Sequence, residues 1–478
     1  MSRPSVVIVG GGISGLAAAW ELTGGARGPR ETTPRVEVIE ASERVGGALA
    51  TTTFAGRTID LGADGFLARR PEAVTLVREL GLDDQLEAIA ESGAWLWSRG
   101  RLNELPKGLV LGVPTTRESI TRFRGVGWRA HLAARRDALL PARLHVGADA
   151  TIGEITRAKL GRELSYQFIE PMIGGIQAGR IDDLSAKSVF PALYAAAQEG
   201  GSLMRAITRP EAAPDPTPVF FSLVDGVGSL PTHLAAHLSG RGVLIRRGVA
   251  VTALRRTPAG SYPLEVDTAA TTTPANAVIL AVPAPSTAAL IGSFDPALDE
   301  LSRIDSAGAA MVTFSVPRDQ VALPPHGTGV LVPLHTAWSG EGPMMVTAVT
   351  FLDRKWPHLR RDDDVLLRAH VGRSDDGRWS ELADEELTRR VSEELAVLLP
   401  RWGEPTESLV QRWPLGLPQY RVGHERLVGL GRQAAARHGV ALAGNAYDGV
   451  GVPASIGSGR RAAREITELI GTTAQSAS

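Results

Sequence analysis

Near its beginning the chain reads Val6-Val7-Ile8-Val9-Gly10-Gly11-Gly12-Ile13-Ser14-Gly15, and the fold follows from these residues. The first four are apolar and β-branched, which predicts a strand buried on both faces. The glycines form a GxGxxG motif, and Leu16 to Leu22 has helical composition. In a dinucleotide-binding turn the first glycine makes the turn, the second lets the backbone approach a pyrophosphate, and the third packs the helix against the strand. The pyrophosphate would then lie at the helix N-terminus, where free N–H groups favour anions.

A second strand and an acidic residue support this interpretation. Arg35 to Ile39 is predicted to be a strand, and Glu40 follows it directly. The Glu40 carboxylate is therefore placed to accept hydrogen bonds from a ribose diol. A lone GxGxxG is weak evidence, but a glycine-rich turn beside a surface glutamate would need both coincidences at the correct spacing. We predict a dinucleotide site.

Two further glycine-containing turns narrow the dinucleotide to FAD. They are Glu43-Arg44-Val45-Gly46-Gly47-Ala48 and Asp60-Leu61-Gly62-Ala63-Asp64-Gly65. Each glycine turn alone would be ordinary, whereas several backbone loops that converge on one cofactor suit a long, extended ligand. With the run Glu-Arg-x-Gly-Gly after a ribose-binding glutamate, the sequence resembles the flavin-containing amine oxidase superfamily.

Composition excludes several classes of protein. The content of 43% hydrophobic and 22% charged residues is that of a soluble globular protein, and a net charge of −1 gives no reason to expect a nucleic-acid partner. The chain has no cysteine, which excludes disulfides, Cys-ligated metals and a flavin attached through Cys, so FAD is expected to bind non-covalently. It also excludes a working pyridine-nucleotide disulfide oxidoreductase. No apolar run reaches ~18 residues, and we expect a cytoplasmic protein, with peripheral membrane association left open.

The chain of 478 residues is too long for one core, so several domains are expected. We predict an α/β fold with a Rossmann-like FAD-binding domain assembled from discontinuous segments, a mixed α+β substrate domain and a mainly helical insertion. The expected segments are 1–92, 209–290 and 427–478 for the FAD-binding domain and its tail, 93–208 for the helical insertion with substrate- or membrane-facing elements, and 291–426 for the substrate-binding domain.

Local patterns predict individual elements within these segments. The expected helices are Pro71 to Leu82, most of Ile152 to Gln198, Thr232 to Ser239, Asp384 to Leu398 and Gly457 to Ile470. The expected strands are Val243 to Arg246, Val249 to Thr252, Ala277 to Pro283, Ala309 to Ser315, Met344 to Phe351 and Gly439 to Asn445, with a hairpin over Trp95 to Pro106. Gly24 to Pro34 is expected to be an exposed loop, and Gly471 to Ser478 a disordered tail.

The arginine-rich stretch Glu118 to Arg143 has two interpretations. Its interleaved apolar residues are Phe123, Trp128, Leu132, Leu139 and Leu140. They could form a membrane-surface or partner-docking face, or an apolar stripe that packs into the core beneath a solvated face. We expect the second arrangement.

Within the superfamily the chain is most similar to the oxygen-dependent protoporphyrinogen and coproporphyrinogen oxidases of haem synthesis. The similarity covers essentially the whole chain and rests on four stretches: Val9 to Ala18, Phe168 to Ala186, Leu417 to His424, and Gly444 to Gly459. It implies that FAD removes six electrons from coproporphyrinogen III in three cycles, with dioxygen as acceptor and hydrogen peroxide as by-product. The arginine-rich, actinobacterium-like character favours coproporphyrinogen III over the alternative substrate, protoporphyrinogen IX. A downstream chelatase is a further expected partner.

The motifs and the resemblance together imply a set of site residues. No catalytic base is implied, and Gly175 is expected to present its backbone carbonyl to the macrocycle. Trp413 and His424 either line the flavin edge or pack within the substrate domain. Ala94 stands beside Trp95 where the eukaryotic enzymes have an arginine, so their mode of holding a propionate is not carried over. The expected cofactor-binding residues are Gly10, Gly11, Gly12, Ile13, Ser14, Gly15, Glu40, Ala41, Arg44, Gly47, Ala48, Gly62, Ala63, Asp64, Gly65, Val251, Trp413, Asn445, Val450, Gly451 and Val452.

Two rival interpretations and one weaker candidate site remain. A flavin amine oxidase would have an aromatic pair beside the flavin and often a lysine near N5, whereas here only Tyr447 is in place, and Lys187 and Lys355 lack a matching context. GDP-dissociation inhibitors share the fold without flavin, but the intact Glu40 and Gly46-Gly47 argue against them. His233 and His237 have a metal-binding i, i+4 spacing; without a third ligand we expect packing or solvent exposure, and no metal.

Overall fold

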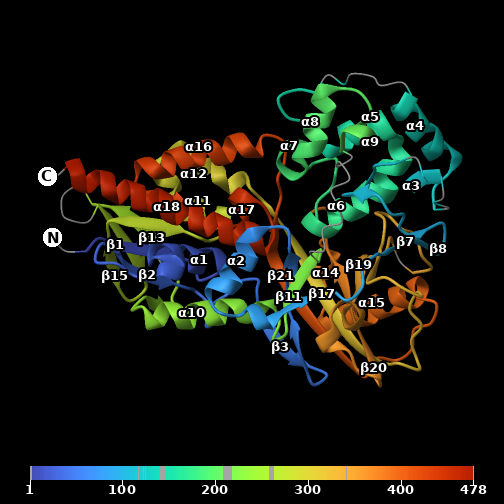
Figure 1. Cartoon of the computed structure of the whole chain (residues 1–478), viewed down its shortest axis with the longest axis horizontal. Coiled ribbons are helices and arrows are strands. Elements are labelled where there is room, and N and C mark those ends of the chain that lie inside the picture. Colours follow the sequence, from blue (N-terminus) through green and yellow to red (C-terminus); the bar gives the residue numbers. More distant parts are fainter. Residues whose placement is uncertain are drawn as a thin grey trace.

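The computed structural model describes residues 3–116, 118–121, 123, 125–139, 144, 146–207, 218–257, 263–340 and 342–476. It has three parts (Figure 1): a layered α/β part that contains both ends of the described chain, a seven-stranded sheet with its own helices, and a helical part formed by α3 to α9. The α/β part is built from segments far apart in the sequence, as predicted for the FAD-binding domain.

A five-stranded parallel sheet forms the centre of the α/β part. Its strand order is β12 (Leu244–Arg246), β2 (Arg35–Ile39), β1 (Ser5–Val9), β16 (Ala277–Leu280) and β22 (Val440–Leu442). The run 6–9 is buried on both faces, because alternate residues pack into two different cores. One core contains α1 (Ile13–Leu22), α2 (Pro71–Glu79), α10 (Leu230–Gly240) and α18 (Val452–Ser476). The other contains α11 (Ala284–Ile291), α16 (His424–Arg437) and the small sheet β13 (Val251–Arg256), β14 (Leu264–Thr268) and β15 (Thr272–Ala275).

The second part is a sheet of seven strands. Its order is β21 (Glu407–Pro418), β17 (Ser306–Pro317), β20 (Asp364–Val371), β19 (Val346–Phe351), β18 (Gly329–Leu331), β7 (Trp95–Ser98) and β8 (Arg101–Glu104). The predicted hairpin is confirmed as β7 and β8, and it joins this sheet through a parallel pairing of β7 with β18, although it falls within the expected helical insertion (93–208). Helix α15 (Asp384–Leu398) packs on one face of the sheet, as the shared core of its leucines with β17, β19 and β20 shows.

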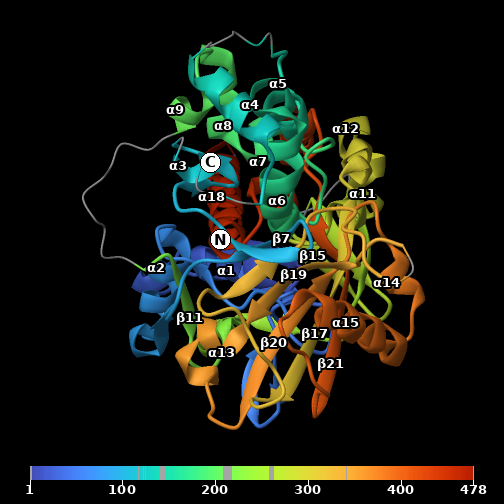
Figure 2. The same ribbon diagram turned by 90° about the vertical axis from the view of Figure 1, so that its right-hand side faces the viewer.

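The helices α3 to α9 lie together in the upper half of Figure 2, and they share a core of their own. Its helices are α3 (Glu118–Thr121), α4 (Trp128–Leu139), α5 (Ile152–Leu164), α6 (Glu170–Gln177), α7 (Ala186–Val189), α8 (Pro191–Glu199) and α9 (Leu203–Ile207). A π-helical turn, Ser165–Ile169, links α5 to α6. Helix α6 contacts β18 and β19, so the helical part meets the seven-stranded sheet at this helix.

The expectation that the apolar stripe of 118–143 packs into the core is wrong for α4. Phe123 is buried, but the side chains of Trp128, Leu132 and Leu139 are 70%, 58% and 64% exposed. Small residues, Ala130 and Ala134, occupy the core-facing side of α4 instead and allow its close approach. Leu140 lies outside the described residues.

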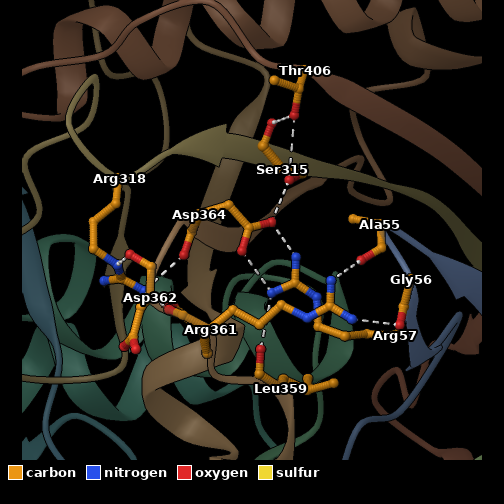
Figure 3. Close-up of polar contacts among 11 residues, drawn as sticks. Ala55, Gly56, Arg57, Ser315, Arg318, Leu359, Arg361, Asp362, Asp364 and Thr406 are labelled. Atoms are coloured by element: carbon orange, nitrogen blue, oxygen red, sulfur yellow. Dashed lines mark hydrogen bonds and ion pairs between the residues drawn. The ribbon is translucent and has the colours of Figure 1, made fainter.

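A polar junction joins the α/β part to the seven-stranded sheet (Figure 3). Arg57 lies in the hairpin formed by β3 (Thr51–Phe54) and β4 (Arg57–Asp60). Its guanidinium forms a two-pronged ion pair with Asp364 of β20 and donates to the carbonyl of Leu359 at 3.1 Å. Arg361 returns the contact by donating to two carbonyls in the β3–β4 turn, at 3.2 and 2.7 Å. The hairpin that precedes the third glycine turn is thereby fixed to the sheet.

Most predicted elements form close to the expected positions. The helix at 384–398 has the predicted limits, and those at 71–79 and 230–240 differ by a few residues. Helix α18 begins at Val452 rather than Gly457, since Pro453 suits the first turn of a helix and starts it earlier. The predicted disordered tail is wrong for residues 471–476, which continue α18; no proline follows Gly471 to stop the helix.

Candidate active site

The GxGxxG turn has the geometry that its sequence predicts. Gly10 has a φ of +104°, and a Cβ there would lie 2.5 Å from the carbonyl oxygen of Ala281. A Cβ at Gly15 would collide with the carbonyl of Gly10, so only glycine lets α1 approach the strand. At Gly12, by contrast, a Cβ would meet nothing within 4 Å. The open side of Gly12 and the first turn of α1, which has no side-chain cap, form a cradle for a phosphate group.

Glu40 closes one end of this cradle. Its carboxylate accepts hydrogen bonds from the backbone N–H of Gly11 at 2.6 Å and from the N–H of Ser42 at 2.9 Å. The neighbouring backbone is paired with the segment after β12, because the N–H of Val249 donates to the Glu40 carbonyl at 2.9 Å. Val251 begins β13 two residues later and packs at the edge of the core beside this acid, on the side where an adenine is expected.

The second glycine turn lies directly against the first. The N–H of Gly46 donates to the carbonyl of Gly11 at 2.8 Å. Arg44 donates to the Gly47 carbonyl at 2.7 Å and to two other carbonyls of its own loop, so its guanidinium braces the turn that contains Gly47 and Ala48. A Cβ at Gly62 would collide with the carbonyl of Ala48, which packs the third turn onto the second. All three turns therefore meet at one place.

A buried charge cluster holds the third turn, Gly62 to Gly65, against the seven-stranded sheet. Arg368 of β20 is 2% exposed and donates to the carbonyls of Asp60 and Gly62. Lys355 donates to the Asp64 carboxylate at 2.8 Å, and the indole N–H of Trp356 donates to it at 3.2 Å. Although burial acts against it, the positive charges of Lys355 and Arg368 lower the pKa of Asp64 to about 2. Asp64 is thus a negative charge within the turn.

The carboxylate of Asp60 faces the opposite way, into the α/β part. It accepts hydrogen bonds from the backbone N–H groups of Val227 at 3.1 Å and Gly228 at 2.8 Å. Burial raises its pKa to about 7, more than these hydrogen bonds lower it. Asp60 therefore ties the third turn to the segment before α10.

Trp413 and His424 have different positions. The indole N–H of Trp413 donates to the carbonyl of Leu61 at 3.0 Å, and its ring lies beside Gly62. His424 instead stacks on the ring of Tyr420, with ring centroids 4.1 Å apart. The Tyr420 hydroxyl donates to the carbonyl of Asn445 and accepts from the N–H of Gly449 at 3.0 Å. Trp413 therefore adjoins the cofactor loops directly, whereas His424 packs behind them.

The segment before α18 completes the ring of loops. Asp448 is held by Arg432 at 2.6 Å, by Arg461 at 3.0 Å and by the hydroxyl of Ser458. These contacts fix the turn Val450-Gly451-Val452, in which a Cβ at Gly451 would meet nothing within 4 Å. The N-terminus of α18 thus has an open approach, where free N–H groups would stabilise negative charge on a reduced flavin.

Gly175 lies on the exposed side of the last turn of α6. Its carbonyl is among the last four of the helix, which have no partner within the helix. A Cβ at Gly175 would meet only Leu331 of β18, at 3.9 Å. Ile176 beside it is 45% exposed. This corner therefore has room for a ligand between α6 and the sheet.

These residues fit FAD. The open cradle at Gly12 suits a pyrophosphate, and the acid at the end of β2 suits a ribose. The two bracing turns and the open N-terminus of α18 suit a flavin ring. Arg368, Asp60 and Tyr420 also hold this site, and sequence reasoning missed the first two; for Arg368, the only available signal is an arginine within the apolar strand 364–371.

Other candidate residues lie elsewhere. Lys187 pairs with Glu425 at 2.8 Å on the surface, away from the loops. His237 is exposed, and its ring lies edge-on to Trp20 with ring centroids 6.1 Å apart, an arrangement that combines packing with solvent exposure. The described residues include no group of three His, Cys, Asp or Glu side chains suited to a metal ion. None of the described helices has both the length and the apolar character of a membrane-spanning segment.

The fold and the loops are those of a flavoprotein, and the chain belongs to the family of flavin containing amine oxidoreductases, whose model matches residues 13–467. The predictions of an α/β flavoenzyme with FAD as cofactor are thereby confirmed. Membership also rules out the flavin-free interpretation.

Relatives within the family are more specific. The coproporphyrinogen III oxidase of Mycobacterium leprae is 34% identical, over 97% of this chain and 98% of its own. The coproporphyrinogen III oxidase of Bacillus subtilis is 32% identical, over 96% and 97%. A crystal structure of a protein from Exiguobacterium sp. 255-15 superposes with a TM-score of 0.85 at 32% identity and covers 98% of this chain and 99% of that one. The predicted resemblance to the porphyrinogen oxidases is confirmed.

Proposed function

We propose that this chain oxidises coproporphyrinogen III to coproporphyrin III in haem biosynthesis, with FAD as cofactor and dioxygen as final acceptor. One observation carries the proposal: the flavin-side turn Gly62 to Gly65 and the exposed carbonyl corner at Gly175 both adjoin the same face of the seven-stranded sheet. Near-full-length similarity to coproporphyrinogen III oxidases supports it.

The residues of the chain have distinct roles in this proposal. The cradle at Gly12, with Glu40, binds the adenosine diphosphate half of the cofactor, and Gly62 to Gly65, Trp413 and Val450 to Val452 surround the flavin ring. When bound there, FAD would supply two-electron oxidation of the substrate, with dioxygen as the final acceptor and hydrogen peroxide as by-product. Gly175 faces the macrocycle and helps to place a meso carbon over the flavin.

The ring system alone does not distinguish the two porphyrinogens. Protoporphyrinogen IX is the alternative substrate, since it has the same macrocycle with two propionates instead of four. An amine substrate is the more distant alternative within the family. Lys355, the lysine nearest the cofactor loops, is already committed to Asp64, which does not favour the amine chemistry.

The experiment is anaerobic stopped-flow with the purified yellow protein. Mixing with coproporphyrinogen III is expected to bleach the flavin band rapidly, with a weaker response to protoporphyrinogen IX. On admission of air, three hydrogen peroxide molecules should form per porphyrin. A protein that neither porphyrinogen reduces would contradict the proposal, and a screen of amines would follow.

We also propose that α4 rests on an anionic membrane surface. Trp128, Leu132 and Leu139 have the i, i+4, i+11 spacing of one helix face, and exposed Arg135 lies among them. Two more exposed arginines, at 129 and 136, flank this face. Exposed apolar residues among arginines match the headgroup boundary of an anionic bilayer.

Sedimentation with vesicles tests this surface. The chain should bind phosphatidylglycerol vesicles and leave phosphatidylcholine vesicles unbound, and Trp128→Glu with Leu132→Glu should abolish binding. Leu430→Glu, at another exposed leucine, is the control and should bind as the unmodified chain does. Equal vesicle binding by the unmodified chain and the Trp128→Glu, Leu132→Glu variant would contradict the proposal. Binding of a purified chelatase in the absence of vesicles would assign the face to that partner instead.

A further inference from the structure

The face of the seven-stranded sheet opposite α15 has a row of partly exposed residues between the flavin-side turn and α6. The strand pairings put Gln411, Met311, His370, Ala348 and Leu331 in one row across five strands. All five are partly exposed. Their neighbours on the outer face, such as Ala310, Ala369 and Val330, are at most 1% exposed and pack into the core with α15. A row of partly exposed residues in the middle of a covered sheet indicates a ligand space.

His370 occupies the centre of this row. At one end of the row Leu331 meets the corner of Gly175. His370 lies two strands from Leu331, about 10 Å at the usual strand spacing. In the adjacent row on the same face, Arg368 grips the turn at Gly62. His370 is therefore placed between the flavin-side turn and the carbonyl corner of α6.

The imidazole of His370 is oriented by one neighbour. Its Nε2 lies 3.1 Å from the hydroxyl of Thr350 on β19. If Nε2 carries the hydrogen and donates to this hydroxyl, Nδ1 is left as an acceptor. Within the described part of the chain, Nδ1 has no hydrogen-bond partner. In that tautomer Nδ1 is an acceptor nitrogen that is available to a ligand on this face of the sheet.

Burial and nearby positive charges both favour the neutral imidazole of His370. Burial lowers its pKa to about 4, and the positive charge of Arg368 on the same strand acts in the same direction. Lys355 of α13 (Leu352–Lys355) also lowers the pKa, while Asp64 in the flavin-side turn opposes these effects. The facing residues of β17 and β19, Met311 and Ala348, do not titrate.

A porphyrinogen ring has four pyrrole N–H donors and no ring nitrogen acceptor, so it needs neutral acceptors around it. We infer that His370 accepts a hydrogen bond from a pyrrole N–H of the bound porphyrinogen through Nδ1, and so positions the macrocycle together with the carbonyl of Gly175. This inference rests on the proposed function.

The test compares four variants with the unmodified chain, all loaded with FAD. His370→Leu removes the acceptor and His370→Gln keeps one, while Thr350→Val leaves the imidazole but removes its orienting partner. His438→Gln is the matched control, because His438 packs against Phe294 on the far side of the α/β part. For each chain, flavin reduction is followed against coproporphyrinogen III concentration to give an apparent Kd, and coproporphyrin III binding is followed by fluorescence quenching.

The expected result is a specific loss of porphyrinogen affinity. His370→Leu should raise the apparent Kd at least tenfold, Thr350→Val severalfold, and His370→Gln and His438→Gln less than threefold, with FAD content and melting temperature unchanged. For the unmodified chain, affinity should be constant between about pH 6 and 8, because the imidazole stays neutral. If His370→Leu does not fold, Thr350→Val carries the test.

Two outcomes overturn the inference. Unchanged porphyrinogen affinity in His370→Leu would show that His370 does not contact the substrate. If His370→Leu does not fold, unchanged affinity in a folded Thr350→Val leads to the same conclusion. An affinity that changes with an apparent pKa near 6.5 contradicts a neutral acceptor. Failure of the proposed function gives a different result, since porphyrinogen would then leave the flavin of the unmodified chain oxidised.

Discussion

Arg57 and Asp364 form a two-pronged ion pair that joins the β3–β4 hairpin to the seven-stranded sheet, and the Arg57 side chain is only 4% exposed. Asp364 also accepts a hydrogen bond from the hydroxyl of Ser315 at 2.6 Å. The hairpin leads directly into the third glycine turn, so this pair fixes the distance between the cofactor loops and the sheet.

Removal of Arg57 should destabilise the chain strongly. Arg57→Met leaves the Asp364 carboxylate without its partner at a nearly buried site, at a cost of about 3–5 kcal/mol. Thermal unfolding and FAD release measure this effect. Arg303→Met is the control: Arg303 is 73% exposed and pairs with Glu300 on the surface, and such pairs contribute about 0–1 kcal/mol. Similar melting temperatures for both variants would show that the junction is not needed for stability.

Asp60 should make stability depend on pH near neutrality. Its folded pKa of about 7 lies above the ordinary aspartate pKa of 3.8, so the folded state binds more protons between these values. The stability it contributes is fully present below the unfolded pKa and is lost as the pH rises through 7. Urea unfolding at pH 5 and pH 8 should therefore show a larger loss for the unmodified chain than for Asp60→Asn. An equal loss in both would place the titration elsewhere.

A side chain at Gly12 should exclude the cofactor without harming the fold. No described protein atom lies within 4 Å of a Cβ there, yet that side is where a pyrophosphate must approach. Gly12→Val is expected to purify colourless, with the melting temperature of the FAD-stripped parent. Gly240→Ala, which also meets nothing within 4 Å, should remain yellow. A yellow Gly12→Val protein would contradict the placement of the pyrophosphate.

A bulky residue at Gly175 should impair turnover while FAD stays bound. Because Leu331 is the nearest neighbour at 3.9 Å, an added side chain points into the ligand space rather than into protein. Gly175→Leu should lower kcat/KM for coproporphyrinogen III at least tenfold, with an unchanged flavin spectrum. Gly174→Ala, on the preceding residue of α6, should have a small effect. Full activity in Gly175→Leu would move the macrocycle away from α6.

Loss of the Tyr420 hydroxyl should loosen the cofactor. Tyr420→Phe leaves the carbonyl of Asn445 and the N–H of Gly449 without their partner, and an unsatisfied buried group costs about 1–3 kcal/mol. FAD dissociation should accelerate by tenfold or more in a dilution assay. Tyr166→Phe is the control, because the Tyr166 hydroxyl contacts Arg157 and Asp182 in the helical part and not the cofactor loops. Equal dissociation rates would assign Tyr420 a packing role.

Sequence reasoning located the parts of the site that are encoded locally. The spacing of Gly10 to Gly15 and of Glu40 is enough to predict a dinucleotide site, and these residues lie together in the structure. Arg368 and His370 could not be found in this way, because their positions depend on how β20 pairs with β17 and β19. In α4 the periodicity shows an apolar face, but whether another element covers Trp128 depends on tertiary packing. The end of α18 was missed because Gly471 does not stop the helix.

The central sheet combines strands that leave the ribosome at very different times. Strand β1 is made first, yet its neighbour β16 comes from residues 277–280, and β22, beyond β16, from residues 440–442. The phosphate cradle is therefore translated long before α18, the helix that we propose to face the flavin, which begins only at Val452. Such non-local pairing folds slowly, and a nascent chain cannot enclose its cofactor before nearly all of it has emerged. Yellow colour in this protein would thus report that the chain has been made as far as α18 as well as folded correctly.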